Sequence, residues 1–164
     1  MKFAIPFVPT SDGSRSDALR SGFASGSHDW SVPGETLDLQ ALFARVVRAY
    51  STGTLEDVRD IVAPPLLRRL AGEVADRKRH RHVLSSRLVE VTSAEIIDRE
   101  DRLLGGWVDI RFVSRMVVAL QAADGTVLAG DPVQARLLSE VWTLQRSTVG
   151  GTSRWAVSAM VEDE

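Results

Sequence analysis

Apolar side chains recur every three or four residues in the part of the chain that follows residue 36. This spacing predicts three consecutive amphipathic helices, because a helix completes a turn about every 3.6 residues. The first covers about 37–51, the second follows Thr54 and runs to about 62, and the third begins at Pro65 and ends near Arg79. We expect the first helix to bury Leu39, Leu42, Phe43, Val46, Val47 and Tyr50.

Beyond His82 the apolar positions alternate instead, which is typical of strands. Strands are predicted over about 83–98, 106–121, 135–147 and 154–161, with a short strand or loop at 127–132. The turns are too short for the crossovers that parallel strands need, so the sheet is antiparallel. The predicted class is α+β, with three helices packed on a four-stranded antiparallel sheet. One face of the second strand should carry Val108, Ile110, Phe112, Met116 and Val118.

The amino-acid composition excludes several classes of functional site. The 164 residues carry a net charge of −2 and include no cysteine, which excludes disulfide scaffolds, iron–sulfur clusters and thiol catalysis. No stretch approaches the roughly 20 apolar residues of a membrane-spanning helix. Residues 1–35 are rich in Ser, Gly and Asp, so we expect a flexible leader there, an ordered domain over 36–161 and a frayed acidic tail at 162–164.

Three passages carry a resemblance to a known family. The first is YSTGTLEDV at 50–58, followed by PPLL at 64–67, and the second is SAEII at 93–97, leading into VDIRF at 108–112. The third is Gly130-Asp131-Pro132, followed by VWTLQR at 141–146 and SRWAV at 153–157. Over about residues 37–161 the chain resembles the Tim44-like domain. This is the C-terminal domain of the 44-kilodalton subunit of the mitochondrial inner-membrane import translocase, and it also occurs in bacterial proteins.

The resemblance implies a cone-shaped, nuclear-transport-factor-2-like fold whose helices and curved sheet enclose an apolar pocket. It also implies a non-catalytic adaptor that needs no cofactor and works at the inner face of an inner membrane. The implied partners are anionic phospholipid or an inner-membrane or chaperone protein, and the expected localisation is cytoplasmic with peripheral membrane contact. The expected pocket lining is Tyr50, Phe112, Trp142 and Trp155, of which the two tryptophans are also large enough to be core residues.

A cluster of cations marks the end of the third predicted helix. One interpretation is that these charges complement the helix dipole, and the other is that they bind anionic lipid or an acidic protein. The negative net charge argues against DNA as a partner. RNA is disfavoured because no aromatic residues stand beside the basic run to stack on bases. The candidate patch consists of Arg68, Arg69, Arg77, Lys78, Arg79 and Arg81.

Two further hypotheses concern metal binding and self-association. His80 and His82 are two residues apart, and a zinc site would need a third ligand such as His28 in the leader, so no metal site is expected. A homodimer through the outer face of the sheet is the second hypothesis. That face would be centred on Trp107, Val113 and Val117.

An enzyme is the alternative to a binding domain, because cone-shaped folds of this type also host isomerases and dehydratases. Such an enzyme needs a pocket carboxylate as the base and a Tyr or a second acid to hold the enolate oxygen. Tyr50 is the single tyrosine of the chain, and Asp60 or Asp109 would be the base. Burial of either aspartate in a cavity would favour this alternative.

Overall fold

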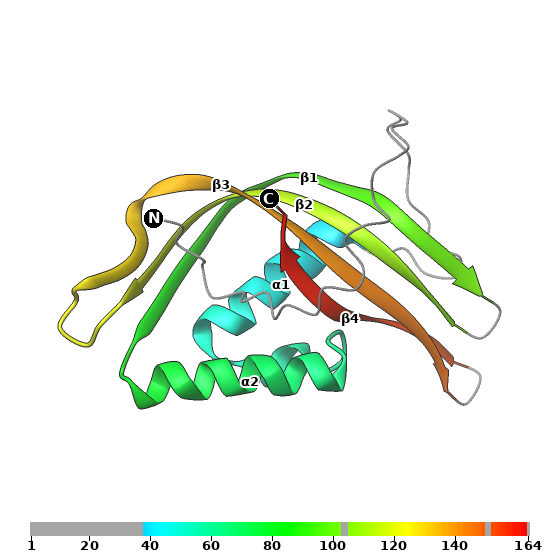
Figure 1. Ribbon diagram of the computed structural model, residues 1–164, viewed down its shortest axis with the longest axis horizontal. Helices are drawn as coiled ribbons and strands as arrows, with labels where there is room; N and C mark the ends of the chain where they lie inside the picture. Colours follow the sequence, from blue (N-terminus) through cyan, green and yellow to red (C-terminus); the bar gives the residue numbers. More distant parts are fainter. Residues whose placement is uncertain (1–37, 103–104, 150–151, 164) are drawn as a thin grey trace.

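The computed structural model describes residues 38–102, 105–149 and 152–163. The predicted leader therefore lies outside the described residues. Two α-helices and a short 3-10 helix precede four strands (Figure 1). In chain order these are α1 (Leu39–Thr52), η1 (Leu55–Val58), α2 (Pro64–Arg79), β1 (Val83–Arg102), β2 (Gly105–Gln121), β3 (Val127–Val149) and β4 (Thr152–Glu162).

The strands form one antiparallel meander in the order β1-β2-β3-β4, which confirms the α+β class and the antiparallel sheet. β1 and β2 pair from Val83 opposite Gln121 to Arg102 opposite Gly105. Along β3, the pairing with β4 covers residues 140–149. Figure 1 shows the sheet bent into an arch, with α1 and α2 on its concave side. The inner face of the sheet therefore meets the helices.

Aromatic packing holds α1 against the sheet. The ring of Phe43 lies 4.8 Å from that of Phe112 and 4.8 Å from that of Trp142, and Phe112 and Trp142 are 5.1 Å apart. All three side chains are fully buried, and aromatic pairs of this kind contribute about 0.5–1.5 kcal/mol each beyond simple burial. The six apolar residues predicted for the inner face of this helix are all buried or half-buried.

The prediction of a second amphipathic α-helix is wrong, because residues 55–58 form a single 3-10 turn, η1. The chain leaves this turn to join the sheet. The N–H of Val157 in β4 donates to the Ile61 carbonyl, and the N–H of Ala63 donates to the Val157 carbonyl, both at 2.8 Å. These bonds need an extended backbone at 61–63, so pairing with β4 overrides the local helical pattern.

The short strand at 127–132 and the strand at 135–147 are parts of one continuous strand, β3. Asp131 lies opposite Val118 and Arg136 lies opposite Met116, so residues 132–135 form a bulge. One carboxylate oxygen of Asp131 accepts the N–H groups of Val133 and Gln134, both at 2.8 Å. Two backbone donors of the bulge are thus satisfied by a side chain and not by a neighbouring strand.

Gly130 opens this bulge with a left-handed backbone, φ 75°. A Cβ atom at this position would lie 2.1 Å from the Val118 carbonyl oxygen of β2. Only glycine lets the two strands come this close. The glycine of the Gly130-Asp131-Pro132 passage is therefore explained by backbone contact.

Gly130→Ala should lower the free energy of unfolding by at least about 2 kcal/mol, because a clash with backbone adds to the cost of a left-handed alanine. Urea denaturation measures this change. Gly72→Ala is the matched control, since Gly72 lies within α2 and has nothing within 4 Å of an added Cβ. The control should be neutral or more stable by about 0.5–1 kcal/mol, and equal losses in both variants would contradict the explanation.

Candidate functional site

Tyr50 joins the end of α1 to α2. Its hydroxyl donates to Glu73 at 2.7 Å, and Arg77 donates to the Tyr50 backbone carbonyl at 2.6 Å. The Arg77 guanidinium carbon also lies 4.4 Å from the centre of the Tyr50 ring. Burial raises the pKa of the Tyr50 hydroxyl, and the hydrogen bond to Glu73 raises it further. The phenol therefore stays protonated and acts as a structural donor.

The six cations of the candidate patch do not form one surface. Arg77 faces inward against Tyr50. Arg69 lies 3.7 Å from Glu73, and both of these side chains are partly buried. Successive residues of a helix point about 100° apart, so a cluster in the sequence is spread around α2. The four exposed members are Arg68, Lys78, Arg79 and Arg81.

Three exposed cations do gather where α2 ends. Backbone N–H groups of Arg81 and His82 donate to the carbonyls of Lys78 and Arg77, at 3.1 and 2.9 Å. This is a Schellman motif, in which the residue after the cap adopts a left-handed backbone, and here that residue is Arg81 with φ 55°. We call Lys78, Arg79, His80, Arg81 and His82 the basic end.

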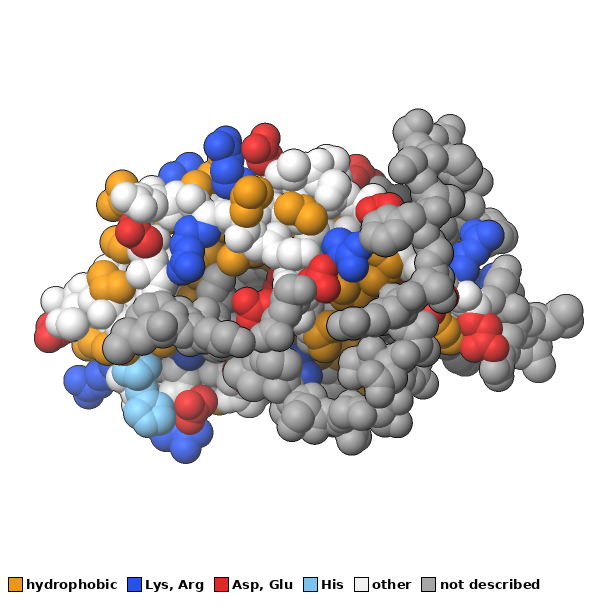
Figure 2. Space-filling model, turned by 45° about the horizontal axis from the view of Figure 1, so that its top comes forward, with side chains coloured by type: hydrophobic (Ala, Val, Ile, Leu, Met, Phe, Trp, Pro, Cys, Tyr) orange, Lys and Arg blue, Asp and Glu red, His pale blue; other side chains and the backbone are white. Residues whose placement is uncertain are grey.

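Figure 2 shows the two histidines of the basic end close together, with cationic side chains beside them. Their rings are 5.5 Å apart. The ring Nδ1 of His80 lies 2.9 Å from the Asp76 carbonyl oxygen, which can only accept, so Nδ1 carries the proton. Arg79 lies 3.1 Å from the Asp76 carboxylate. Within the described ranges, Lys78 and Arg81 take part in no ion pair.

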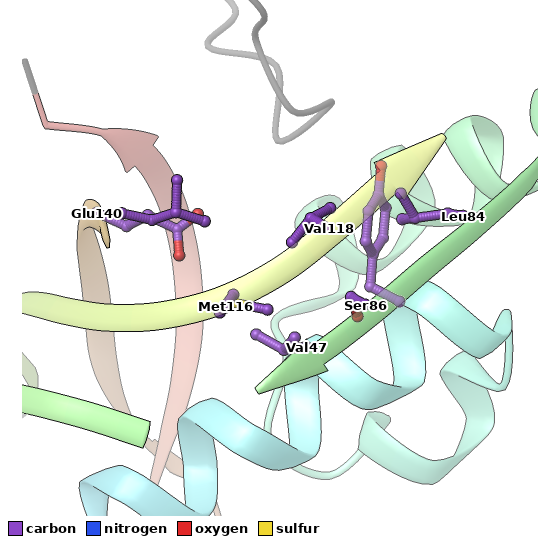
Figure 3. Close-up of a pocket in the computed structure, with 8 residues that line it drawn as sticks. Val47, Leu84, Ser86, Met116, Val118 and Glu140 are labelled. Atoms are coloured by element: carbon purple, nitrogen blue, oxygen red, sulfur yellow. The ribbon is translucent and has the colours of Figure 1, made fainter. Parts of the chain in front are cut away.

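A small cavity lies between α1 and the sheet (Figure 3). Its volume is about 20 Å³, which is room for about one water molecule. Tyr50 is part of its wall, whereas Phe112, Trp142 and Trp155 are not among the lining residues. The first two of these are core residues, and Trp155 packs against the core. The lining consists of Val47, Tyr50, Leu84, Ser86, Met116, Val118, Leu138 and Glu140.

Glu140 is the titratable group of this cavity that sequence reasoning missed. It lies on β3 and is only 8% exposed. Its pKa is raised from 4.5 to about 7, mainly because burial disfavours the carboxylate; the Trp142 side chain opposes this shift, and the nearby Glu162 carboxylate adds to it. A carboxyl group with such a pKa can exchange a proton near neutral pH, but the space beside it does not fit an organic substrate. The sequence does carry a signal for its burial, because Glu140 is two residues from Trp142 and therefore lies on the same, inner face of β3.

The acids considered for an enzyme lie elsewhere. Asp60 is exposed and pairs with Arg45 at 2.8 Å. Asp109 accepts a hydrogen bond from Thr143 at 2.5 Å, and neither aspartate lines the cavity. Neither one is therefore a pocket base.

The outer face and the C-terminal tail are held by further polar contacts. The Trp107 indole N–H donates to Glu100 at 2.9 Å. Val113 is half-buried, and Val117 is buried although it lies outside the core cluster.

Glu162 is the last residue of β4, and Asp163 accepts hydrogen bonds from Arg111 and Ser139. The described part of the acidic tail is thus attached to the sheet.

The described part of the chain offers no candidate metal site and no candidate membrane span. No group of three or more His, Asp or Glu side chains there is placed to hold a metal ion. No helix among the same residues is both long and apolar enough to cross a bilayer.

Comparison with known proteins identifies the family. A family model described as the Tim44-like domain matches residues 34–162. The chain belongs to the Tim44-like domain family. This match confirms the resemblance carried by the three sequence passages, and it includes the helices, the whole sheet and the Gly130-Asp131-Pro132 bulge of this Tim44-like domain.

Other comparisons are less informative. The intermembrane space region of the chloroplast protein ARC6, a crystal structure, aligns with a TM-score of 0.45 and 9% sequence identity. The alignment covers 77% of this Tim44-like domain and 98% of the ARC6 chain, and a likeness of this degree carries no functional information. A search of curated protein sequences finds no significant match.

Replacing Arg77 separates its structural role from that of the exposed cations. Arg77→Ala should lower the free energy of unfolding by about 2–3 kcal/mol, because it removes a charged hydrogen bond and the contact with the Tyr50 ring. Arg79→Ala, which removes an exposed ion pair, should change it by less than about 1 kcal/mol. Chemical denaturation of both variants gives the comparison, and equal effects would place Arg77 with the surface charges.

The raised pKa of Glu140 makes stability depend on pH. The unfolded state ionises near pH 4.5 and the folded state near pH 7, so stability falls as pH rises between these values. The full loss, about 3 kcal/mol, is present above pH 7. Glu140→Gln should remove this loss and be more stable than the parent at pH 8 but not at pH 4. Denaturation at both pH values tests this, with the exposed Glu95→Gln as the control.

Proposed function

We propose that this Tim44-like domain is a non-catalytic binding domain that docks on an anionic membrane surface through its basic end. The observation that carries the proposal is the gathering of Lys78, Arg79 and Arg81 at one exposed helix terminus, two of them without ion pairs among the described residues. Each cation near an anionic bilayer contributes about 1 kcal/mol of attraction. Three together give a reversible, salt-sensitive contact.

The backbone at Arg81 supports a role for its charge. A left-handed residue at a helix end is usually glycine, because a side chain there costs about 1–2 kcal/mol. The chain carries arginine at this position and bears that cost. A need for the guanidinium in a contact with another molecule explains why this position is arginine and not glycine.

The family supports the location and the absence of chemistry. We expect this surface to lie at the cytoplasmic face of an inner membrane, which the resemblance to the family implies. The cavity beside Glu140, at about 20 Å³, holds about one water molecule, which weighs against an isomerase or dehydratase. Docking on an acidic protein, in place of lipid, is an outcome that the vesicle experiment distinguishes.

Removing the three exposed charges should weaken docking strongly. The variant Lys78→Gln, Arg79→Gln, Arg81→Gln should bind vesicles of anionic phospholipid roughly 100-fold more weakly than the parent, because about 3 kcal/mol of attraction is lost. Co-flotation with anionic and with neutral vesicles measures the binding. The parent should float only with anionic vesicles and be released by salt.

A charge-matched control carries three substitutions on exposed arginines of the sheet, Arg87→Gln, Arg136→Gln and Arg154→Gln. It has the same net charge as the test variant and should keep most of the vesicle binding. Equal loss of vesicle binding in both variants would show a non-specific charge effect. If the parent floats with neither anionic nor neutral vesicles, a protein is left as the partner. Both outcomes contradict the proposal.

Arg81→Gly tests the arginine without threatening the fold. Glycine relieves the left-handed backbone, so the free energy of unfolding should stay the same or rise by up to about 1 kcal/mol. Vesicle affinity should nevertheless fall about fivefold, since one cation is lost. Denaturation and co-flotation of the same preparation give both values, and unchanged vesicle binding would show that the guanidinium is not used.

A further inference from the structure

A groove runs beside α2 on the side of η1. Its volume is about 230 Å³, which is below the roughly 300–1,000 Å³ of pockets that enclose a small-molecule ligand. Leu55 and Val74 form part of its walls. Ala71 and Ala75, both exposed on α2, also line it. We call it the α2–η1 groove. A groove of this size and lining fits apolar side chains of a segment that lies across it, and not a complete ligand.

One cation of the basic end stands at this groove. The Lys78 ammonium lies 3.6 Å from the position that a Cβ would take at Gly53, and both residues line the groove. The carboxylate of Glu56, another lining residue, is paired with Arg59 at 3.2 Å. A segment in the groove therefore contacts a lysine on which the proposed docking depends.

The chain itself carries a segment that matches this groove. Residues 3–8 have the sequence FAIPFV, and residues 10–35 contain no similar apolar run. Pro6 and the following Pro9 have no N–H group, so the segment presents few unmatched donors to an aliphatic wall. The first charged residue after the segment is Asp12, whose charge is opposite to that of Lys78.

The length of the chain lets this segment reach the groove. Between Val8 and Asp38, the N-cap of α1, lie 29 residues, which span up to about 100 Å when extended. The 14 residues of α1 rise only about 21 Å, and the C-cap of this helix is Gly53, a lining residue of the groove. Because it is tethered, the segment has a higher effective concentration at the groove than a free peptide has.

We propose that residues 3–8 dock in the α2–η1 groove of the same chain and thereby restrain the basic end. The apolar side chains of the segment pack on the aliphatic walls, and the Asp12 carboxylate comes close to Lys78. The restraint rests on the proposed function, because membrane docking is what the covered lysine serves. The docking of the segment in the groove does not depend on it.

A spin label beside the segment reports where the segment lies. The chain has no cysteine, so Thr10→Cys gives the full chain a single attachment point for a nitroxide, which broadens the amide NMR signals near it. The signals of Gly53, Leu55 and Ala71 should be broadened. Broadening of another surface, or of none, would overturn the proposal. Broadening of isotope-enriched chain by added spin-labelled chain would show docking on a second copy, which also contradicts it.

Substitutions in the segment test which side chains make the contact. Phe3→Ser with Phe7→Ser should abolish the broadening, because the aromatic rings are the largest apolar groups of the segment. Leu19→Ser with Phe23→Ser is the matched control, since it removes two apolar side chains outside the segment, and it should leave the broadening unchanged. Equal broadening in the two variants would show that residues 3–8 are not the docked segment.

Filling the groove should displace the segment and leave every charge in place. Ala71→Leu with Ala75→Leu should remove the broadening, and both positions are exposed on α2, so the helix tolerates leucine there. Gly72→Ala, on the same helix but outside the groove lining, is the control and should behave like the parent. A filled variant that keeps the parental broadening would place the segment outside the groove.

Vesicle binding tests the restraint. Phe3→Ser with Phe7→Ser should bind anionic vesicles about fivefold more tightly than the parent, because Lys78 becomes available. Co-flotation measures the affinity, and the control with Leu19→Ser and Phe23→Ser should match the parent. Equal or weaker binding by the first variant would overturn the restraint. Vesicle docking without broadening at the groove would defeat this inference alone, whereas broadening without vesicle docking would defeat only the proposed function.

Discussion

The contact of Phe43 with Phe112 and Trp142 determines how the rest of the molecule is arranged. These three rings fix α1 against the concave face of β2 and β3. The end of α1 then places Tyr50, and Tyr50 positions α2 through Glu73 and Arg77. The basic end lies at the C-terminal end of α2. Its placement therefore depends on aromatic packing in the core of the domain.

Charges on α2 serve two purposes, and the direction of each side chain separates them. Arg69 and Arg77 lie against Glu73 and Tyr50 and help to join the helices. The cations at the end of the helix face solvent. A helix that carried only the inward pair would have the same core but no basic end. The packing of α2 and its surface chemistry can therefore change independently.

Regular periodicity was enough to predict the inner face of α1, the alternation along β2 and the antiparallel order of the strands. Contacts between distant residues were not readable in the same way. Pairing of residues 61–63 with Val157 shortens the second predicted helix to η1. No pattern in the local sequence predicts this pairing. The direction of Arg77 and the burial of Glu140 likewise depend on the position of α1 and β4. The Gly130-Asp131-Pro132 passage is visible in the sequence, but only the nearby Val118 carbonyl explains its glycine.

The bulge in β3 also affects how the chain behaves among its neighbours. Among the described strands, none pairs with the outer edge of β3 before residue 140. An edge of this kind with exposed Val133 and Leu137 would ordinarily be a template for aggregation. Here proline has no N–H to offer, and the next two donors are already bonded to Asp131. An incoming strand would find no ladder to extend across this stretch. The carboxylate of Asp131, which shapes the bulge, therefore occupies two donors that edge-to-edge pairing would need.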